Sequence, residues 1–338
     1  MISVEAVHDA TASVKENRRT IGIASMRALV YDAYGPIERL ELRDIPSPRP
    51  RDGQLVVEVR RAALNPKDAL FRKGRFRAIS GGRFPKQCGL DFAGVVLESR
   101  SRHFTPGQRV FGALNEWRFA RGTLAQQVVV DEEEAALLPA GVSDDAGAAV
   151  ALVGLTALQA LRDLATVRSG TRVLIHGASG GVGTHAIQVG RALGATIVTT
   201  SSERNLELCA RLGSAKTLDY KSDVVSALDG RVDVVFDVFG NFAPEMARKA
   251  LGGRGVLVST VPSAGRFLLD RLTRWRAFQR RLIVVRPKRR DLELLARWLQ
   301  EGTLEAVIDR SVPLLRVHDG FRALESKRAR GKILVEVA

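Results

Sequence analysis

The sequence contains very little cysteine. Only Cys88 and Cys209 occur among its 338 residues, and neither belongs to a Cys-x-x-Cys or Cys/His pattern. This spacing argues against a disulfide framework and is compatible with a reducing compartment, so we expect a cytoplasmic protein. Histidine is scarce too, with five residues scattered along the chain. Because a zinc site needs a cluster of thiolate, imidazole or carboxylate ligands, we expect no metal.

Long apolar runs are also lacking. The best candidate for a membrane span, residues 147–161, is short and is interrupted by Gly154, Thr156 and Gln159. We therefore expect no transmembrane helix. The first 25 residues have no apolar signal core and carry three acidic residues, which transit peptides usually avoid. We expect them to form a poorly ordered extension, because strand-like patterning begins only after them.

Acidic residues are outnumbered by basic ones. The chain has 52 Lys and Arg against 37 Asp and Glu, which gives a formal net charge of +15. Such an excess favours anionic partners, whether a phosphorylated cofactor, an acidic lipid surface or nucleic acid. Residues 266–290, the basic segment, hold ten of the basic residues and one acidic residue.

The basic segment 266–290 has the pattern of an amphipathic helix. Its apolar stripe would be formed by Leu268, Leu272, Trp275 and Leu282, with arginines on the other face. The simplest interpretation is a helix that packs on its own domain. The alternatives are an anionic membrane surface, which basic amphipathic helices favour, an acidic substrate, or nucleic acid, which is the least favoured of the three.

The first part of the chain has the pattern of an all-β unit with little helix. Short β-like runs bounded by turn residues extend over residues 26–138, for example LVVEVRRAAL (55–64). The pattern then changes at Ser143 and Asp144. These are good capping and first-turn residues for the long apolar helix that follows.

Strict alternation of strand and helix comes next. The six expected strands are TRVLIHG (171–177), ATIVTTS (195–201), AKTLDY (215–220), RVDVVFDV (231–238), RGVLVST (254–260) and RLIVVRP (281–287). Amphipathic helical patterns separate most of them, so we expect a parallel sheet covered on both faces. The predicted fold class is α/β, with a doubly wound sheet domain over residues 146–305. The chain end should return to the β-rich unit, which would combine residues 26–145 and 306–338.

Two motifs overlap in the stretch VLIHGASGGVG (173–183). Residues 177–181 fit the G-x-S-x-G elbow of a serine hydrolase, whereas residues 178–183 fit a dinucleotide-binding turn with Ala in place of the first glycine. A hydrolase needs an acid and a histidine downstream. His185 lies on the helix that the elbow would start, and nothing supports His318. The turn follows the first strand of a multi-unit α/β domain, which favours the dinucleotide interpretation.

The end of the next strand indicates which dinucleotide is bound. An NAD site usually has Asp or Glu there, about 20 residues after the turn. This chain has Ser201 and Ser202 at that position, followed by Glu203 and Arg204. Hydroxyls and a guanidinium suit the 2′-phosphate of NADPH, which is our prediction. Glu203 is the counter-evidence, since a shift of one residue would restore a preference for NADH, and Arg204 also has an ordinary interpretation as a solvated residue at a helix start.

Several short motifs occur in a characteristic order: LNPKD (64–68), FPKQCGLDFAGVV (84–96), GLTALQAL (154–161), HGASGGVGTHAIQVGRALGA (176–195), LDY (218–220), VDVVFDVFG (232–240) and SKRARGKILVEV (326–337). Together they resemble the zinc-independent quinone oxidoreductases of the medium-chain dehydrogenase/reductase superfamily. The resemblance extends from Met26 to the C-terminus. It implies a GroES-like β domain with the active site, a Rossmann domain, a cleft between them that holds NADPH, and a fold that often forms homodimers.

The resemblance also implies site residues. Asn65 would lie near the nicotinamide and the substrate, with Asp68 nearby, and Thr156 would approach the carboxamide. The implied cofactor-binding residues are Ala178, Ser179, Gly180, Gly181, Val182, Gly183, Ser201, Arg204, Tyr220, Phe239, Gly240 and Val261, the last with its loop from Ser259. Three of these residues have ordinary alternatives: Asn65 as a turn former, Thr156 as a core residue bonded to its own helix, and Tyr220 as a strand-end aromatic.

Two departures from the pattern concern metal and protons. Zinc-dependent relatives carry His-Glu after a glycine, whereas this chain has Gly89-Leu90-Asp91. Leu70 stands where some quinone oxidoreductases have a tyrosine that could donate a proton. We expect an NADPH-dependent oxidoreductase that transfers hydride to quinones or activated alkenes, with protons from water or a cofactor hydroxyl. The alternative is an NADPH-binding protein with weak or no catalysis that acts through its basic surface on a membrane or on nucleic acid.

Overall fold

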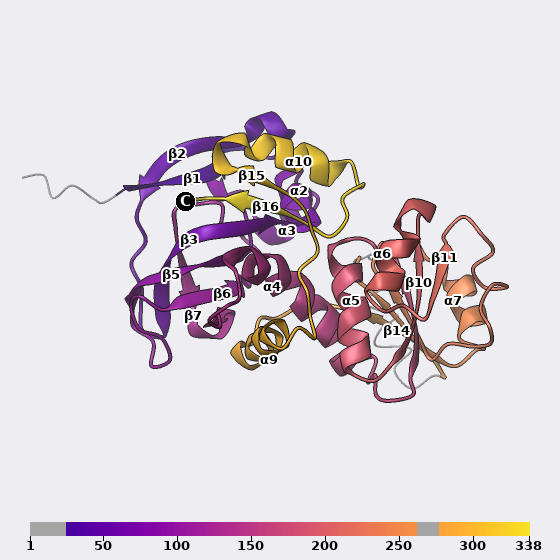
Figure 1. Ribbon diagram of the computed structural model, residues 1–338. Helices are drawn as coiled ribbons and strands as arrows, with labels where there is room; N and C mark the ends of the chain where they lie inside the picture. The colour runs from indigo at the N-terminus through magenta and orange to yellow at the C-terminus, as the bar shows by residue number, and fades with distance from the viewer. Residues whose placement is uncertain (1–24, 262–276) are drawn as a thin grey trace, which may run out of the picture.

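The structure is a computed structural model that describes residues 25–261 and 277–338. It has two lobes, one rich in β-strands and one with alternating strands and helices (Figure 1). The indigo N-terminal strands and the yellow C-terminal segment lie together in the β-rich lobe (Figure 1). The expected N-terminal extension, apart from Ser25, and residues 266–276 of the basic segment lie outside the described residues.

The α/β lobe contains a six-stranded parallel sheet in the order β11–β10–β9–β12–β13–β14. Its strands are β9 (Arg172–His176), β10 (Thr196–Ser201), β11 (Lys216–Asp219), β12 (Val234–Asp237), β13 (Gly255–Ser259) and β14 (Phe278–Leu282), with helices α5 (Gly181–Ala192), α6 (Leu206–Arg211) and α7 (Pro244–Ala250) between them. Counted from β9, the order is 3-2-1-4-5-6, which is that of the doubly wound dinucleotide-binding fold. The predicted fold class is confirmed.

The last strand of this sheet differs from the sequence expectation. β14 begins at Phe278 and ends at Leu282, so the expected strand RLIVVRP is a strand only in its first two residues. Leu282 pairs with Ser259 of β13 and is buried, so its assignment to the apolar stripe of a basic helix is wrong. β14 is the edge strand of the sheet. An edge strand tolerates half-exposed arginines, which is why the sequence pattern concealed it. The other three residues of the stripe lie outside the described residues.

The β-rich lobe is built from two sheets. The larger has the order β15–β16–β3–β5–β6–β8, and β7 also pairs with β3. Its strands are β3 (Gln54–Leu64), β5 (Asp91–Ser99), β6 (Arg109–Ala113), β7 (Gln127–Asp131), β8 (Ala135–Leu137), β15 (Ile308–Pro313) and β16 (Lys332–Glu336), and the smaller sheet has β1 (Ser25–Tyr31), β2 (Glu41–Pro46) and β4 (Lys86–Gln87). β16 pairs antiparallel with β3, so the chain end returns to this lobe. The domain boundaries themselves stay a prediction.

Short helices complete the β-rich lobe: α2 (Pro66–Arg72), α3 (Arg77–Ser80) and α10 (Val317–Glu325). α2 follows β3 directly, because proline is favoured in the first turn of a helix. The carboxylate of Asp68 accepts a hydrogen bond from the backbone N–H of Asn65 at 2.8 Å, which closes this first turn. The arrangement fixes Asn65 between the end of a buried strand and the start of a helix.

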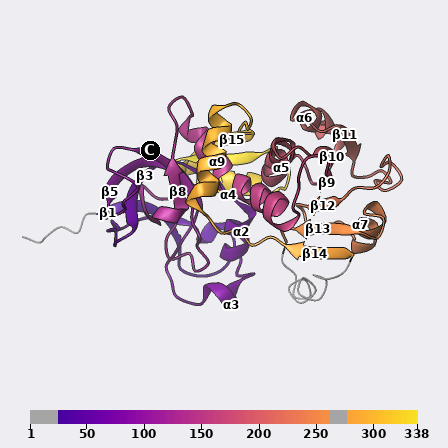
Figure 2. The same ribbon diagram turned by 90° about the horizontal axis from the view of Figure 1, so that it is seen from below.

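A long helix, α4 (Asp144–Leu158), joins the two lobes (Figure 2). The Ser143 hydroxyl accepts from the Ala146 N–H at 3.1 Å, so the predicted capping residue begins it. A π-helical turn extends it to Leu164. The resulting 21-residue helix is long and apolar enough to cross a membrane by length and composition, and 78% of its most apolar stretch is buried inside the protein. The expectation that no segment is long and apolar enough to span a membrane is therefore wrong by length and composition, because small and polar residues interrupt the apolar run without interrupting the helix.

The burial of α4 has a clear packing reason. Its apolar side chains share one core with the larger sheet of the β-rich lobe and with α9 (Arg289–Gln300). A Cβ at Gly154 would lie 2.9 Å from Cδ1 of Leu295 on α9, so the glycine allows the two helices to approach closely. The residues of α4 belong to hydrophobic cores of both lobes, which accounts for the burial of the helix.

Candidate active site

The glycine-rich turn between β9 and α5 is shaped by close contacts at two positions. Gly177 has φ +84°, and a Cβ there would lie 2.5 Å from the Phe239 ring. A Cβ at Gly183 would lie 2.6 Å from the backbone of Ala178, so only glycine lets α5 start this close to the strand. The second contact explains the position of Gly183, which the dinucleotide interpretation used for the packing of the helix on the strand.

Gly180 differs from these two glycines because the space in front of it is open. A Cβ at Gly180 would find its nearest atom, the Gly177 carbonyl oxygen, at 3.9 Å. Gly180 is the residue before α5, whose first-turn N–H groups have no partner inside the helix. Free N–H groups and the positive end of the helix dipole favour an anion. This cradle fits the pyrophosphate of a dinucleotide.

Ser179 is not placed as a nucleophile. Its hydroxyl accepts from the Asn205 amide at 2.9 Å, and its carbonyl accepts from the Gly331 N–H at 3.0 Å. The imidazole of His176 contacts Thr200 and Asn241 instead. Among the described residues no histidine contacts the Ser179 hydroxyl, which agrees with the dinucleotide interpretation.

The end of β10 gathers hydroxyl and guanidinium groups. Ser201 is buried there, whereas Arg204 is exposed. Arg330 of the segment before β16 donates to the Arg204 carbonyl at 3.2 Å, and the Arg204 guanidinium donates to the Arg328 carbonyl at 3.3 Å. The buried Oδ1 of Asn205 has no partner among the described residues. The end of β10 therefore has two neighbouring arginines, Arg204 and Arg330, where the sequence pattern indicated only Arg204.

Three of the predicted cofactor-binding residues are large apolar side chains exposed to solvent. Tyr220 is 51% exposed, Phe239 48% and Val261 40%. They follow β11, β12 and β13, at the carboxyl edge of the sheet where ligands of this fold bind. Gly240 has φ +76°, and a Cβ there would lie 2.5 Å from Cγ2 of Val261. The two loops thus pack against each other and present an apolar surface that a bound dinucleotide would cover.

A buried polar cluster lies at the end of β3. The Asn65 amide donates to the Asp91 carboxylate at 2.6 Å and to the Ala63 carbonyl at 3.2 Å. Lys332, the first residue of β16, donates to Asn65 Oδ1 at 2.6 Å and to Asp91 at 3.1 Å. All three side chains are at most 3% exposed. The cluster brings the predicted Asn65 together with two residues, Asp91 and Lys332, that no sequence motif had assigned to the site.

Lys332 also touches the dinucleotide turn. A Cβ at Gly181 would lie 3.0 Å from Cδ of Lys332, and Gly180 forms a parallel bridge with Gly331. The alkyl part of Lys332 therefore packs on the cofactor turn, while its ammonium holds Asn65. This contact joins the two lobes at the point where the cofactor and catalytic residues are expected.

Asp68 lies beside the cluster. Its carboxylate accepts from the backbone N–H groups of Asn65 at 2.8 Å and Gly89 at 3.2 Å. Burial raises the pKa of Asp68 to about 6, and these N–H groups oppose the shift. The structure thus brings Asp68 and Asn65 together as predicted from sequence, with Asp68 as the group that shapes the first turn of α2.

Thr156 lies on α4 and His185 on α5, and apolar residues of these two helices share one core. The Thr156 hydroxyl donates to the Leu152 carbonyl at 2.6 Å, and the Leu152 N–H donates to Asp91 at 2.6 Å. His185, on α5, is fully buried, and one ring nitrogen contacts the Gly181 carbonyl at 2.7 Å. Burial lowers the pKa of His185 to about 4, so it is neutral at physiological pH. Its Nε2 has no partner among the described residues.

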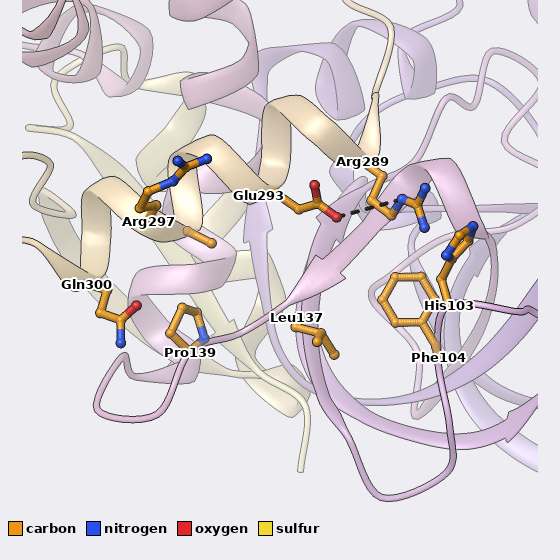
Figure 3. Close-up of a pocket in the computed structure, with 9 residues that line it drawn as sticks. His103, Phe104, Leu137, Pro139, Arg289, Glu293, Arg297 and Gln300 are labelled. Carbon is orange, nitrogen blue, oxygen red and sulfur yellow. Dashed lines mark ion pairs between the residues drawn. The ribbon is translucent and has the colours of Figure 1, made fainter.

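Two further features, possible metal ligands and a surface groove beside α9, were compared with the positions of these site residues. In residues 25–261 and 277–338, no group of three or more His, Cys, Asp or Glu side chains is placed to hold a metal ion. A groove of about 300 Å³ lies between β8, the loop before β6 and α9 (Figure 3). Arg289 and Glu293 form an ion pair of 3.8 Å at its rim (Figure 3). None of the predicted site residues lines this groove.

Comparison with known proteins finds two matching family models. The model described as "Alcohol dehydrogenase GroES-like domain" matches residues 51–140, and that described as "Zinc-binding dehydrogenase" matches residues 212–335. The chloroplast envelope quinone oxidoreductase homolog of Arabidopsis thaliana is 30% identical over 329 residues, or 92% of this chain and 98% of that protein. The 2-methylene-furan-3-one reductase of Solanum lycopersicum is 31% identical over 338 residues, or 96% and 82%. The solved quinone oxidoreductase from Coxiella burnetii superposes with a TM-score of 0.85 at 29% identity, covering 93% of this chain and all of that one.

Proposed function

Because this chain belongs to the zinc-independent, quinone oxidoreductase-like members of the medium-chain dehydrogenase/reductase superfamily, we propose that it reduces quinones or activated alkenes with NADPH. The family binds a nicotinamide cofactor, and the glycine-rich turn fits one. One observation carries the proposal: Lys332 joins this turn to the buried Asn65 cluster across the two lobes. The names of the relatives, a quinone oxidoreductase homolog and an enone reductase, support the acceptor class.

The chain supplies position and electrostatics, while the bound cofactor supplies the hydride. We propose Asn65, Asp68 and Thr156 as the residues at the reacting end. The Asn65 amide donates to the Ala63 carbonyl and to the Asp91 carboxylate, so both of its N–H groups are used. Asn65 therefore limits the space for the substrate and does not donate a hydrogen bond to it. The Thr156 hydroxyl donates to Leu152, which leaves its oxygen to accept from the carboxamide.

NADPH rather than NADH is the cofactor that we propose. Ser201, Arg204 and Tyr220 stand at the end of β10 and β11, and Arg330 adds a second guanidinium beside Arg204. Guanidinium groups bind phosphate oxygens with charge-assisted hydrogen bonds. Titration of the protein with each cofactor, followed by protein fluorescence, should show tighter binding of NADPH. Equal affinity for NADH would contradict this part of the proposal.

The reductase activity is tested with an acceptor panel. Oxidation of NADPH and NADH is followed by the loss of reduced-nicotinamide absorbance with several quinones and with α,β-unsaturated ketones and aldehydes. We expect turnover with NADPH and at least one acceptor class. Tight NADPH binding without turnover on any acceptor would reject the reductase and favour the alternative, a cofactor-binding protein that acts through its basic surface.

For the basic segment 266–290 we propose an anionic membrane surface rather than nucleic acid. The segment supplies most of the excess positive charge, and one relative is named for the chloroplast envelope. Sedimentation with vesicles should show binding that requires anionic lipid and weakens with salt. Equal binding to neutral vesicles would contradict it.

A homodimer in the cytoplasm completes the proposal. Both described cysteines are free and buried, as expected in a reducing compartment. Relatives are named as chloroplast and mitochondrial proteins, so the compartment needs its own test. Light scattering measures the oligomeric state, and cell fractionation measures the compartment; a monomer, or recovery in an organelle fraction, would contradict the respective part.

A further inference from the structure

Lys67 is a half-buried lysine in the first turn of α2, two residues after Asn65. In both views α2 lies at the margin of the β-rich lobe nearest the α/β lobe (Figures 1 and 2). The ammonium nitrogen of Lys67 lies 3.9 Å from the centre of the Trp117 ring and 5.5 Å from that of Phe71. No sequence pattern had singled out this residue for a role.

The surroundings of Lys67 leave its ammonium only partly hydrogen-bonded. An ammonium has three N–H donors, and among the described residues only the Glu116 carbonyl accepts from Lys67, at 3.0 Å. The Glu116 carboxylate is engaged elsewhere, by the N–H groups of Arg118 and Phe119 and by Arg121. No carboxylate forms an ion pair with Lys67 in the described part of the chain.

Two other buried lysines provide the contrast. Lys332 donates to three acceptors, and Lys86 donates to the carbonyls of Ser80 and Arg118. Their ammonium groups are fixed by the protein, as expected for structural lysines. Lys67 keeps two N–H donors for a group that the described part of the chain does not supply.

We propose that Lys67 is the proton donor for the reduced acceptor, and this inference rests on the proposed function. After hydride addition to the β-carbon of an enone, the acceptor is an enolate that needs one proton. The Lys67 ammonium would give that proton to the enolate, forming the C–H or O–H bond, and the neutral amine would regain a proton from water. One hydride and one proton thus reach the acceptor, which balances the reduction.

The acidity of Lys67 suits this role near neutral pH. Burial lowers the pKa of Lys67 to about 8, and the negative charges of Asp68 on its own helix and of Glu116 on the facing loop oppose the shift. Arg121, which forms an ion pair with Glu116, and Lys86 and Arg118 are the other charged groups around Glu116. A general acid works best when its pKa is close to the operating pH. The donor must be protonated, so activity should fall as the pH rises through about 8.

The first experiment compares Lys67→Arg with the native protein. The introduced guanidinium would keep the cation over the Trp117 ring and the hydrogen bond to Glu116, but it does not release its proton near neutral pH. We expect NADPH affinity and the melting temperature to be preserved, and kcat on an enone to fall by about 10²-fold. The fall on a quinone should be smaller, because the quinol anion is a weaker base than an enolate. Native-like enone turnover in Lys67→Arg would overturn the proposal.

The second experiment tests proton transfer directly. Lys67→Ala should lose the limb of the kcat/KM profile near pH 8 and recover enone turnover when small alkylamines are added. Lys249→Met, at an exposed lysine on α7, is the matched control and should behave as the native protein. If Lys67→Ala keeps the native profile, Lys67 is not the donor while the reductase proposal stands. If the native protein turns over no acceptor at all, the proposed function fails, and the role of Lys67 fails with it.

Discussion

The polar cluster at the end of β3 and the glycine-rich turn at the start of α5 differ in how many of their hydrogen-bonding groups have partners within the protein. At the end of β3, Asn65, Asp91 and Lys332 engage one another in a closed, buried network. At the start of α5, Gly180 faces open space, and the first N–H groups of the helix have no partner inside the helix and can bind an anion. A buried network that is fully satisfied fixes geometry, whereas an open turn gains its partners only from a ligand. The first side is therefore a support built by the protein, and the second is a surface completed by the cofactor.

The largest loss of stability is expected when the buried network of Asn65, Asp91 and Lys332 loses one of its charges. Lys332→Met keeps the apolar stem on Gly181 but leaves the Asp91 carboxylate buried without its cation. Removal of one partner of a buried ion pair costs about 3–5 kcal/mol of unfolding free energy. Urea unfolding measures it, with Lys327→Met, at an exposed lysine of the preceding segment, as the control. If both variants are equally stable, the cluster does not support this end of β3.

The closed side should recover when both charges are removed together. Asp91→Asn combined with Lys332→Met leaves no unpaired charge, so part of the lost stability should return. Stability losses that simply add in the double variant would contradict an interaction between the two residues.

The shifted pKa values of Asp68 and His185 should make the stability of the protein depend on pH. The pKa of Asp68 is raised to about 6 in the folded state, so its contribution to stability is present below about pH 4 and is lost as the pH rises through about 6. The pKa of His185 is lowered to about 4, so its contribution is present above about pH 6.5 and is lost as the pH falls through about 4. Between these limits the two contributions change in opposite directions with pH, each by about 3 kcal/mol.

Asp68→Asn separates these two titrations. Relative to this variant, the native protein should lose about 3 kcal/mol of stability between pH 4 and pH 7. The variant alone should lose stability on acidification more steeply than the native protein, since His185 then acts unopposed. Urea unfolding across this range measures both, and Asp52→Asn, at a fully exposed position, serves as the control. Parallel curves for native protein and Asp68→Asn would contradict the raised pKa.

The open side is tested by two alanine substitutions in one turn. Gly183→Ala places a Cβ 2.6 Å from the Ala178 backbone, and such overpacking costs about 1–3 kcal/mol. Gly180→Ala meets no atom closer than 3.9 Å, so the melting temperature should stay unchanged while NADPH affinity falls about tenfold. Calorimetry and cofactor titration distinguish them. A Gly180→Ala protein with native NADPH affinity would show that the pyrophosphate lies elsewhere.

The smallest effect concerns the choice of cofactor. Arg204→Gln should reduce the preference for NADPH over NADH by about tenfold, because its exposed guanidinium contributes one charge-assisted contact. Glu203→Gln, at the neighbouring exposed residue, should leave the preference nearly unchanged. The ratio of kcat/KM for the two cofactors measures both. An increase of NADPH preference in Glu203→Gln alone would mean that Glu203 faces the ribose.

The sequence predicted those features of the fold that are determined by residues close together in the chain. The turn from Gly177 to Gly183, the capping of α4 at Ser143 and the alternation of the α/β lobe are local patterns, and the structure contains them. β14 was misplaced because an edge strand with half-exposed arginines lacks a clear alternation.

The missed residues have partners that are distant in the chain. Lys332 contacts Asn65 across 267 positions, and Lys67 contacts Glu116 across 49. A single sequence contains no signal for such pairs, although the basic run before the last strand was a hint for Arg330. The sequence therefore predicted residues for the site without revealing the residues that contact and support them.

The pairing of Lys332 with the Asn65 cluster has a consequence for biosynthesis. A ribosome delivers Asn65 and Asp91 long before Lys332, which follows them by 267 and 241 residues. At about 5–20 residues per second, the delay is roughly 10–50 s. During that time the Asp91 carboxylate has no ammonium partner, so the β-rich lobe cannot close around it. The nascent chain must keep this carboxylate in contact with water, and the site can form only once β16 has left the exit tunnel.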